Sequence, residues 1–111
     1  MTKKNNLIDS LELLSSSSDD QRKYLRNLFG NKYFNVDEIL LEYEDAKFLR
    51  DSYNENIKIM FLELDKILEK IDEYELYNID DLNNDIWNQV RNKSKVILGI
   101  INYKSPNVTD L

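Results

Sequence analysis

The chain has 111 residues, of which 41% are hydrophobic and 32% charged, a composition typical of one globular domain rather than of a disordered chain. It contains two glycines, one proline, no histidine and no cysteine, so it lacks the turn residues of a β-sandwich or barrel and cannot form a disulfide. We therefore expect an all-α fold, a single-domain bundle of four to five helices over residues 1–111, with residues 1–3 and 103–111 as flexible tails.

The formal net charge is −6, and the negative charge is concentrated in the middle of the chain. Residues 37–85 carry five Lys or Arg against sixteen Asp or Glu, a net of −11. Such a surface repels phosphate groups, which predicts no nucleic-acid partner and no membrane partner, and it attracts a basic protein. Asp9 and Glu12 interrupt the only segment that resembles a signal peptide, and no apolar run approaches the roughly 20 residues that span a bilayer. We therefore expect a cytoplasmic protein.

The first two predicted helices lie on either side of the serines at 15–18. Residues 4–14 have the apolar spacing of an amphipathic helix, and Ser18 to Gln21 have the pattern of a capping box that begins a second helix. Gly30 predicts the end of that helix, because glycine readily adopts the left-handed conformation there. The expected buried positions are Leu7, Ile8, Leu11 and Leu14 in the first helix and Tyr24, Leu25, Leu28 and Phe29 in the second.

A third helix is predicted to begin at Asn35, whose side chain can cap it, with Glu38 reaching back to the cap. It would run to about Tyr53. The polar residues 54–56 include no Gly or Pro, so residues 36–77 fit either one long bent helix or two helices.

The remaining helices are predicted from wide apolar stripes that can face a core. Asp80 or Asp81 can cap the last helix, Trp87 is its expected core anchor, and Pro106 predicts that the helix does not continue into the C-terminal tail. The stripes are Ile57, Met60, Phe61, Leu64, Ile67, Leu68, Ile71 and Tyr74, then Ile86, Val90, Ile97 and Ile101.

The residue types that most catalytic and metal sites use are missing. Without histidine or cysteine there is no common general base, thiolate or zinc site, and two isolated glycines cannot form a phosphate loop. Glu38, Glu42 and Asp45 lie at i, i+4 and i+7, and we interpret this row as a solvated or partner-facing side of a helix. We predict no enzyme activity, no catalytic residue, no cofactor and no metal; an enzyme that uses carboxylates alone is the weaker alternative.

A helical wheel divides the third helix into two faces. Leu41 and Phe48, seven residues apart, lie opposite the presumed core side, and four carboxylates flank them. Two alternatives follow: the N-terminal helix covers this pair, or the pair is the apolar centre of an interface with a charged rim. The candidate partner-binding residues are Asp37, Glu38, Leu41, Glu44, Asp45 and Phe48, with a second acidic patch at Asp72, Glu73, Glu75, Asp80 and Asp81. The expected core side comprises Val36, Ile39, Leu40, Tyr43, Ala46 and Tyr53.

The stretches "VDEILLEYEDA" and "LYNIDDLNNDIWNQVRNKSKVIL" resemble small acidic all-helical immunity proteins of bacterial toxin–immunity systems, including contact-dependent growth inhibition and other polymorphic toxin systems. Ser94 stands where that pattern often has a small apolar residue. The matching positions are Asp20, Gln21, Tyr24, Leu25, Asp37, Glu38, Leu41, Glu42, Asp45, Trp87, Val90, Arg91, Lys95, Ile97 and Leu98.

The resemblance implies a protein that binds and neutralises a cognate toxin without catalysis of its own. A toxin that acts on nucleic acid has a basic surface, which an acidic protein can occupy. The expected partner is therefore a basic, nuclease-type toxin domain. The alternative is a phage- or plasmid-encoded inhibitor or regulator that binds another basic host protein.

Overall fold

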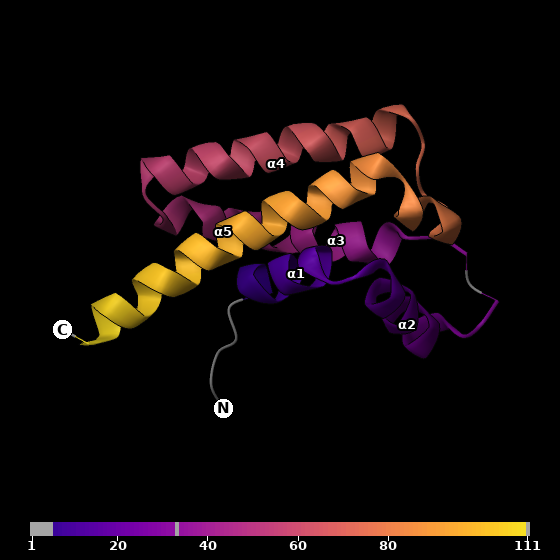
Figure 1. Cartoon of the computed structure of the whole chain (residues 1–111), viewed down its shortest axis with the longest axis horizontal. Helices are drawn as coiled ribbons and strands as arrows, with labels where there is room; N and C mark the ends of the chain where they lie inside the picture. The colour runs from indigo at the N-terminus through magenta and orange to yellow at the C-terminus, as the bar shows by residue number, and fades with distance from the viewer. Residues whose placement is uncertain (1–5, 33, 111) are drawn as a thin grey trace.

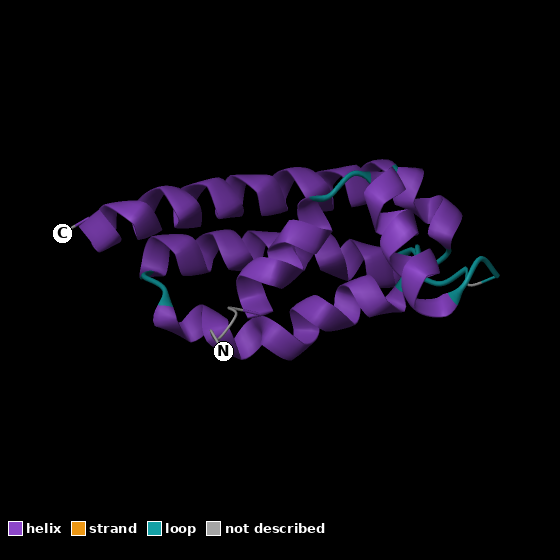
Figure 2. Ribbon diagram, turned by 90° about the horizontal axis from the view of Figure 1, so that it is seen from below, coloured by secondary structure: helices purple, strands orange, loops and turns teal. Residues whose placement is uncertain are grey.

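The computed structural model describes residues 6–32 and 34–110, with side chains as far as residue 101. In chain order the elements are α1 (Asn6–Ser15), α2 (Ser18–Phe29), α3 (Asp37–Ala46), the 3-10 helix η1 (Lys47–Ser52), α4 (Glu55–Glu73), the 3-10 helix η2 (Ile79–Asn83) and α5 (Asp85–Asp110). The described part of the chain holds no β-strand, only one isolated bridge between Asn35 and Asn78. The all-α bundle expected from the sequence is confirmed (Figures 1 and 2).

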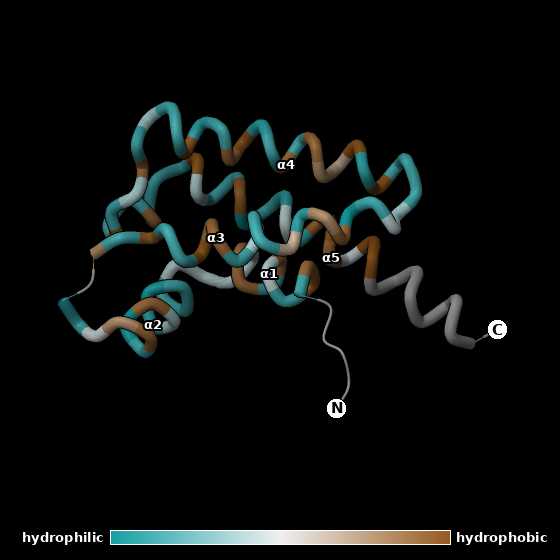
Figure 3. The backbone as a smooth tube through the Cα atoms, turned by 180° about the vertical axis from the view of Figure 1, so that it is seen from behind, coloured by the Kyte–Doolittle hydropathy of each residue, from teal (hydrophilic) through white to brown (hydrophobic). Residues whose placement is uncertain are grey.

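The short helix α1 packs against both α3 and α5, and α4 packs along α5 (Figure 1). Helix α3 lies between α4 and α2 when the molecule is seen from behind (Figure 3). The core runs through the middle of this arrangement, with Trp87 as its largest fully buried side chain. The indole N–H of Trp87 donates to the carbonyl of Leu76 at 3.0 Å, so the buried ring has a partner for its polar atom. Its expected role as a core anchor is confirmed.

Local signals set the ends of α2 close to the expected positions, but α3 begins at Asp37 without a side-chain cap, and Asp80 and Asp81 lie in η2 instead of capping the last helix, which begins at Asp85. Ser17 rather than Ser18 caps α2, because its hydroxyl accepts the backbone N–H of Asp20 at 3.1 Å. Gly30 ends α2 with a φ of 91°, a conformation that glycine adopts more easily than other residues. Residues 36–77 form two α-helices rather than one: α3 ends at Ala46, and the side chain of Asn54 caps the start of α4. The predicted α-helix to Tyr53 was therefore too long, since η1 replaces its last part.

Further sequence predictions about burial and helix ends are wrong. Leu28 and Phe29 are about half exposed, and Tyr74 is more than half exposed. Their helical period is correct, but α2 and the end of α4 lie at the margin of the bundle, where none of the other described elements covers these side chains. Helix α5 continues to Asp110 through Pro106, because a proline removes one hydrogen bond and bends a helix without always ending it. The predicted flexibility of residues 1–3 concerns residues outside the described part.

No helix in the described residues is long and apolar enough to cross a membrane.

Candidate functional site

The outer face of α3 and η1 is open to solvent. Leu41 is 49% exposed and Phe48 is 69% exposed, whereas Ile39, Tyr43 and Ala46 on the opposite side are buried. The division into a core side and a second face is therefore confirmed. The alternative that α1 covers Leu41 and Phe48 is wrong, because α1 packs on the core side of α3.

The carboxylates around Leu41 form two rows, one on each side of α3. The row that faces α2 contains Glu38, Glu42 and Asp45. The hydroxyl of Tyr24 on α2 donates to Glu42 Oε2 at 3.2 Å, and partial burial followed by the charge of Glu42 raises the pKa of Tyr24 to about 12. Partial desolvation, then the hydrogen bond and charge of Glu42, raises the pKa of Glu38. This row is thus a crowded acidic edge between α2 and α3.

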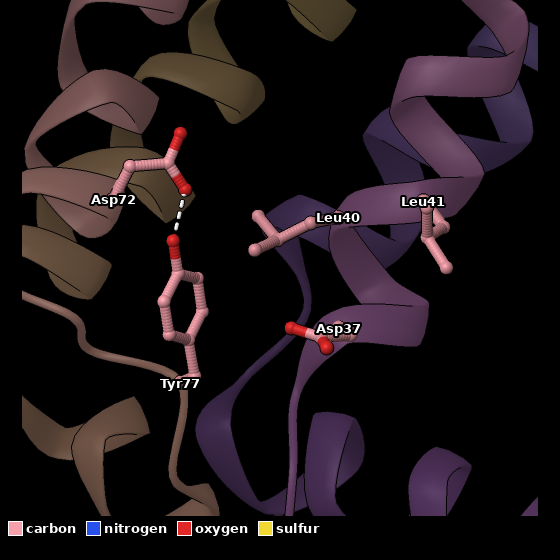
Figure 4. A pocket seen from close by; sticks show the side chains of 5 residues that line it. All are labelled: Asp37, Leu40, Leu41, Asp72 and Tyr77. Atoms are coloured by element: carbon pink, nitrogen blue, oxygen red, sulfur yellow. Dashed lines mark hydrogen bonds between the residues drawn. The ribbon is translucent and has the colours of Figure 1, made fainter.

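The row that faces α4 borders a hollow of about 330 Å³ (Figure 4). Asp37, Leu40 and Leu41 line it from α3, and Asp72 and Tyr77 line it from the last turn of α4 and the loop that follows. The Tyr77 hydroxyl donates to the Asp72 carboxylate across one wall. That hydrogen bond, helped by desolvation and by the negative charges of Asp72 and Asp37, raises the pKa of Tyr77 to about 12.

A second, smaller hollow of about 120 Å³ shares Asp72 with the first, and we call the two hollows together the groove between α3 and α4. A partly buried hydrogen-bond network joins the two helices near this second hollow. The guanidinium of Arg50 donates to Asp65 at 2.7 Å and to the Tyr43 hydroxyl at 3.2 Å, and Tyr43 donates to Asp65 at 3.2 Å. Burial, followed by the charge of Asp65, raises the pKa of Tyr43. The lining residues of the second hollow are Glu44, Lys47, Asp65, Leu68, Glu69 and Asp72.

The second predicted acidic patch does not form one surface. Asp72 lines the groove, and Glu75 lies in a turn with a φ of 54°, near enough to Tyr77 to affect its pKa. Asp81 has a structural role, because its carboxylate accepts the backbone N–H of Asn78 at 3.0 Å in the capping box of η2. Glu73 and Asp80 are exposed and line neither hollow.

The structure therefore brings Asp37, Leu41, Glu44 and Asp72 together along the groove and directs Glu38 and Asp45 to the opposite edge of α3. Sequence reasoning missed Tyr77, and only its position just after an acidic turn could have suggested it. In the described residues, no group of three or more His, Cys, Asp or Glu side chains is placed to hold a metal ion.

Comparison with known protein families, curated proteins and solved structures finds no match to this chain.

The positions on which the expected resemblance rests divide into two groups in the structure. Gln21 on α2 and Arg91 on α5, 70 residues apart in sequence, are both buried and hydrogen-bonded to each other at 2.9 Å. Ser94, the position at which the pattern often has a small apolar residue, is fully buried, and its hydroxyl has no hydrogen-bond partner in the described structure. The other interior matches are Leu25, Trp87, Val90, Ile97 and Leu98, while Asp37, Leu41, Glu42 and Asp45 are exposed.

Proposed function

We propose that this chain is an immunity protein that binds a cognate bacterial toxin and neutralises it through the acidic outer face of α3. The observation that carries the proposal is the exposure of Leu41 and Phe48 inside a frame of carboxylates. A large apolar side chain on the surface of a charged helix is informative when none of the protein's own elements covers it. An apolar centre with a polar rim is also the usual anatomy of a protein interface.

The charge of this face favours a basic partner. The segment from residue 37 to residue 85, which contains α3 and α4, carries a net charge of −11. Carboxylates in the rim accelerate the encounter with a basic protein, and apolar contacts at the centre slow dissociation. A toxin that acts on nucleic acid has such a basic surface, so an acidic protein bound there also blocks access of the substrate.

The first test is whether the protein protects cells from the product of a neighbouring gene. Co-expression should restore growth of cells that express that toxin, and the two proteins should co-purify in a one-to-one ratio. Capture instead of a basic host protein, with no toxin gene beside this gene, would overturn the proposal in favour of an inhibitor or regulator from a phage or plasmid.

A second test locates the binding face with two matched variants. The first variant neutralises the rim with the substitutions D37N, E38Q, E44Q and D45N. The control removes the same number of charges elsewhere with E12Q, D51N, E55Q and E63Q, all at exposed positions.

The rim variant should bind the toxin at least about tenfold more weakly, and its affinity should depend less on salt concentration. The reason is that the rim charges attract the partner and that salt screens this attraction. The control should change affinity by less than about threefold. Equal effects of the two variants would rule out α3 as the binding face. Circular dichroism of both variants verifies that the helices remain folded.

A further inference from the structure

The hollow between α3 and the end of α4 has the lining that a long cationic side chain needs. Leu40, Leu41 and the ring of Tyr77 provide apolar surface, and the carboxylates of Asp37 and Asp72 belong to opposite walls (Figure 4). Its volume of about 330 Å³ lies at the lower end of the roughly 300–1,000 Å³ of ligand pockets. The hollow can therefore admit one side chain of a partner rather than a whole element.

The described side chains do not balance the negative charge of the hollow with an ion pair. None of the ion pairs among the described side chains involves Asp37 or Asp72. The hydrogen-bond partner of Asp72 is the neutral hydroxyl of Tyr77. Asp72 also lies in the last turn of α4, where the helix dipole is negative and disfavours a carboxylate. A cation placed here would relieve an existing electrostatic cost.

We propose that this hollow binds an arginine side chain of the basic partner, with the guanidinium between Asp37 and Asp72. The methylene groups of the arginine would pack on Leu40 and Leu41, and the guanidinium plane would lie near the ring of Tyr77. Arginine is preferred to lysine because its planar fork donates to two carboxylates and stacks on aromatic rings. This inference rests on the proposed function, since it names the chemistry by which the partner is anchored.

The test uses a short peptide, acetyl-Gly-Gly-Arg-Gly-Gly-amide, titrated into the full ¹⁵N-labelled chain. Matched peptides carry lysine or citrulline, the neutral isostere of arginine, in place of the arginine. The arginine peptide should shift the backbone amide signals of Leu40, Leu41, Asp72 and Tyr77, and the citrulline peptide should bind about tenfold more weakly because it lacks the charge. Equal binding of arginine and citrulline peptides, or shifts spread over the whole acidic surface, would overturn the proposal. Equal binding of the lysine peptide would overturn the assignment to a guanidinium.

A matched pair of variants locates the site. Asp72→Asn removes the charge but keeps an oxygen that can accept the Tyr77 hydrogen bond, and it should weaken arginine-peptide binding about tenfold. The control, Glu73→Gln, removes one charge at the next position, which is exposed and outside the hollow, and should leave binding within about twofold. Equal weakening by the two substitutions would show general charge attraction and sink the hollow as a site.

The peptide test needs no toxin, so its failure concerns the hollow alone. If toxin affinity is unchanged by D37N with D72N but lost with L41S and F48S, the immunity function stands and the arginine anchor is refuted. Loss of toxin affinity with D37N and D72N, but not with the Glu73→Gln control, supports the anchor.

Discussion

Replacing Gln21 by methionine tests whether the buried polar network, rather than the apolar core alone, holds α1, α2 and α5 together. Gln21 is fully buried, and its amide group donates to the carbonyls of Leu13 and Leu14 at 3.0 and 3.1 Å, where α1 ends. Its oxygen accepts Arg91 Nη1 at 2.9 Å, and Arg91 Nη2 donates to the carbonyl of Leu82 at 2.7 Å. These acceptors are neutral, and burial, with the nearby charge of Arg22, lowers the pKa of Arg91.

The magnitude follows from the three hydrogen bonds that Gln21→Met removes. One of them pairs a buried charged donor, and such a bond contributes about 1.5–3 kcal/mol. The carbonyls of Leu13 and Leu14 lose their hydrogen bonds to the Gln21 amide group, which adds roughly 1 kcal/mol in total to the loss of stability. Methionine has a similar length and helix propensity, so the expected loss in the free energy of unfolding is about 3 kcal/mol. For a domain of this size that corresponds to a fall in Tm of roughly 10–15 °C.

Thermal and urea unfolding, followed by circular dichroism, measure this loss. The control is Gln89→Met on α5, where the lost hydrogen bond to Asp85 is exposed, and it should cost less than about 0.5 kcal/mol. In the double variant with Arg91→Met the buried charge is also gone, so the total loss should be smaller than the sum of the single losses by about 1.5–3 kcal/mol. A loss below about 1 kcal/mol for Gln21→Met, or strict additivity in the cycle, would refute this reasoning.

Three further predictions concern Tyr77, the two ends of α4 and Ser94. The pKa of Tyr77 is about 12 in the folded protein and near 10 in the unfolded chain. The urea concentration at the unfolding midpoint should therefore decrease as the pH rises from 10 to 12, and it should decrease less in Y77F. Because of the helix dipole, E55K in the first turn of α4 should lower the free energy of unfolding by about 0.3–1 kcal/mol, and E73K in the last turn should raise it by a similar amount. Urea unfolding measures both changes, and changes of the same sign would contradict this prediction. Ser94→Ala removes a buried hydroxyl without a partner in the described structure, so Tm should rise, and a lower Tm would show that the hydroxyl is hydrogen-bonded.

Sequence periodicity predicts the fold well where a helix is covered along its whole length. Leu7, Leu11 and Leu14 of α1 are buried as expected, and so are Ile57, Phe61 and Leu64 on α4. The prediction failed for Leu28, because periodicity identifies the apolar side of a helix but not how much of that side another element covers. Burial of Gln21 was missed for a related reason, since its partner Arg91 lies 70 residues away in sequence.

Only part of the candidate site could be predicted from the sequence. Helical geometry alone places Leu41 opposite the core side of α3, and the structure confirms it. The groove depends on how α3 and α4 lie relative to each other, which no local pattern encodes. Asp37 and Asp72 were therefore predicted in two separate patches. In the structure they line the same hollow, and the charges of both raise the pKa of Tyr77.

Carboxylates lie in the last turns of both helices that border the groove, where the helix dipole is negative. Glu44 and Asp45 lie in the last turn of α3, which has no basic residue, and Asp72 and Glu73 lie in the last turn of α4. Carboxylates at these negative helix ends make the free protein less stable than a charge-balanced variant would be. The core has electrostatic conflicts of its own at the buried Arg91 guanidinium and the Ser94 hydroxyl, but the carboxylates beside the groove are open to solvent and accessible to a partner. A basic partner would neutralise these carboxylates on binding, and the same residues that weaken the free protein would then stabilise the complex.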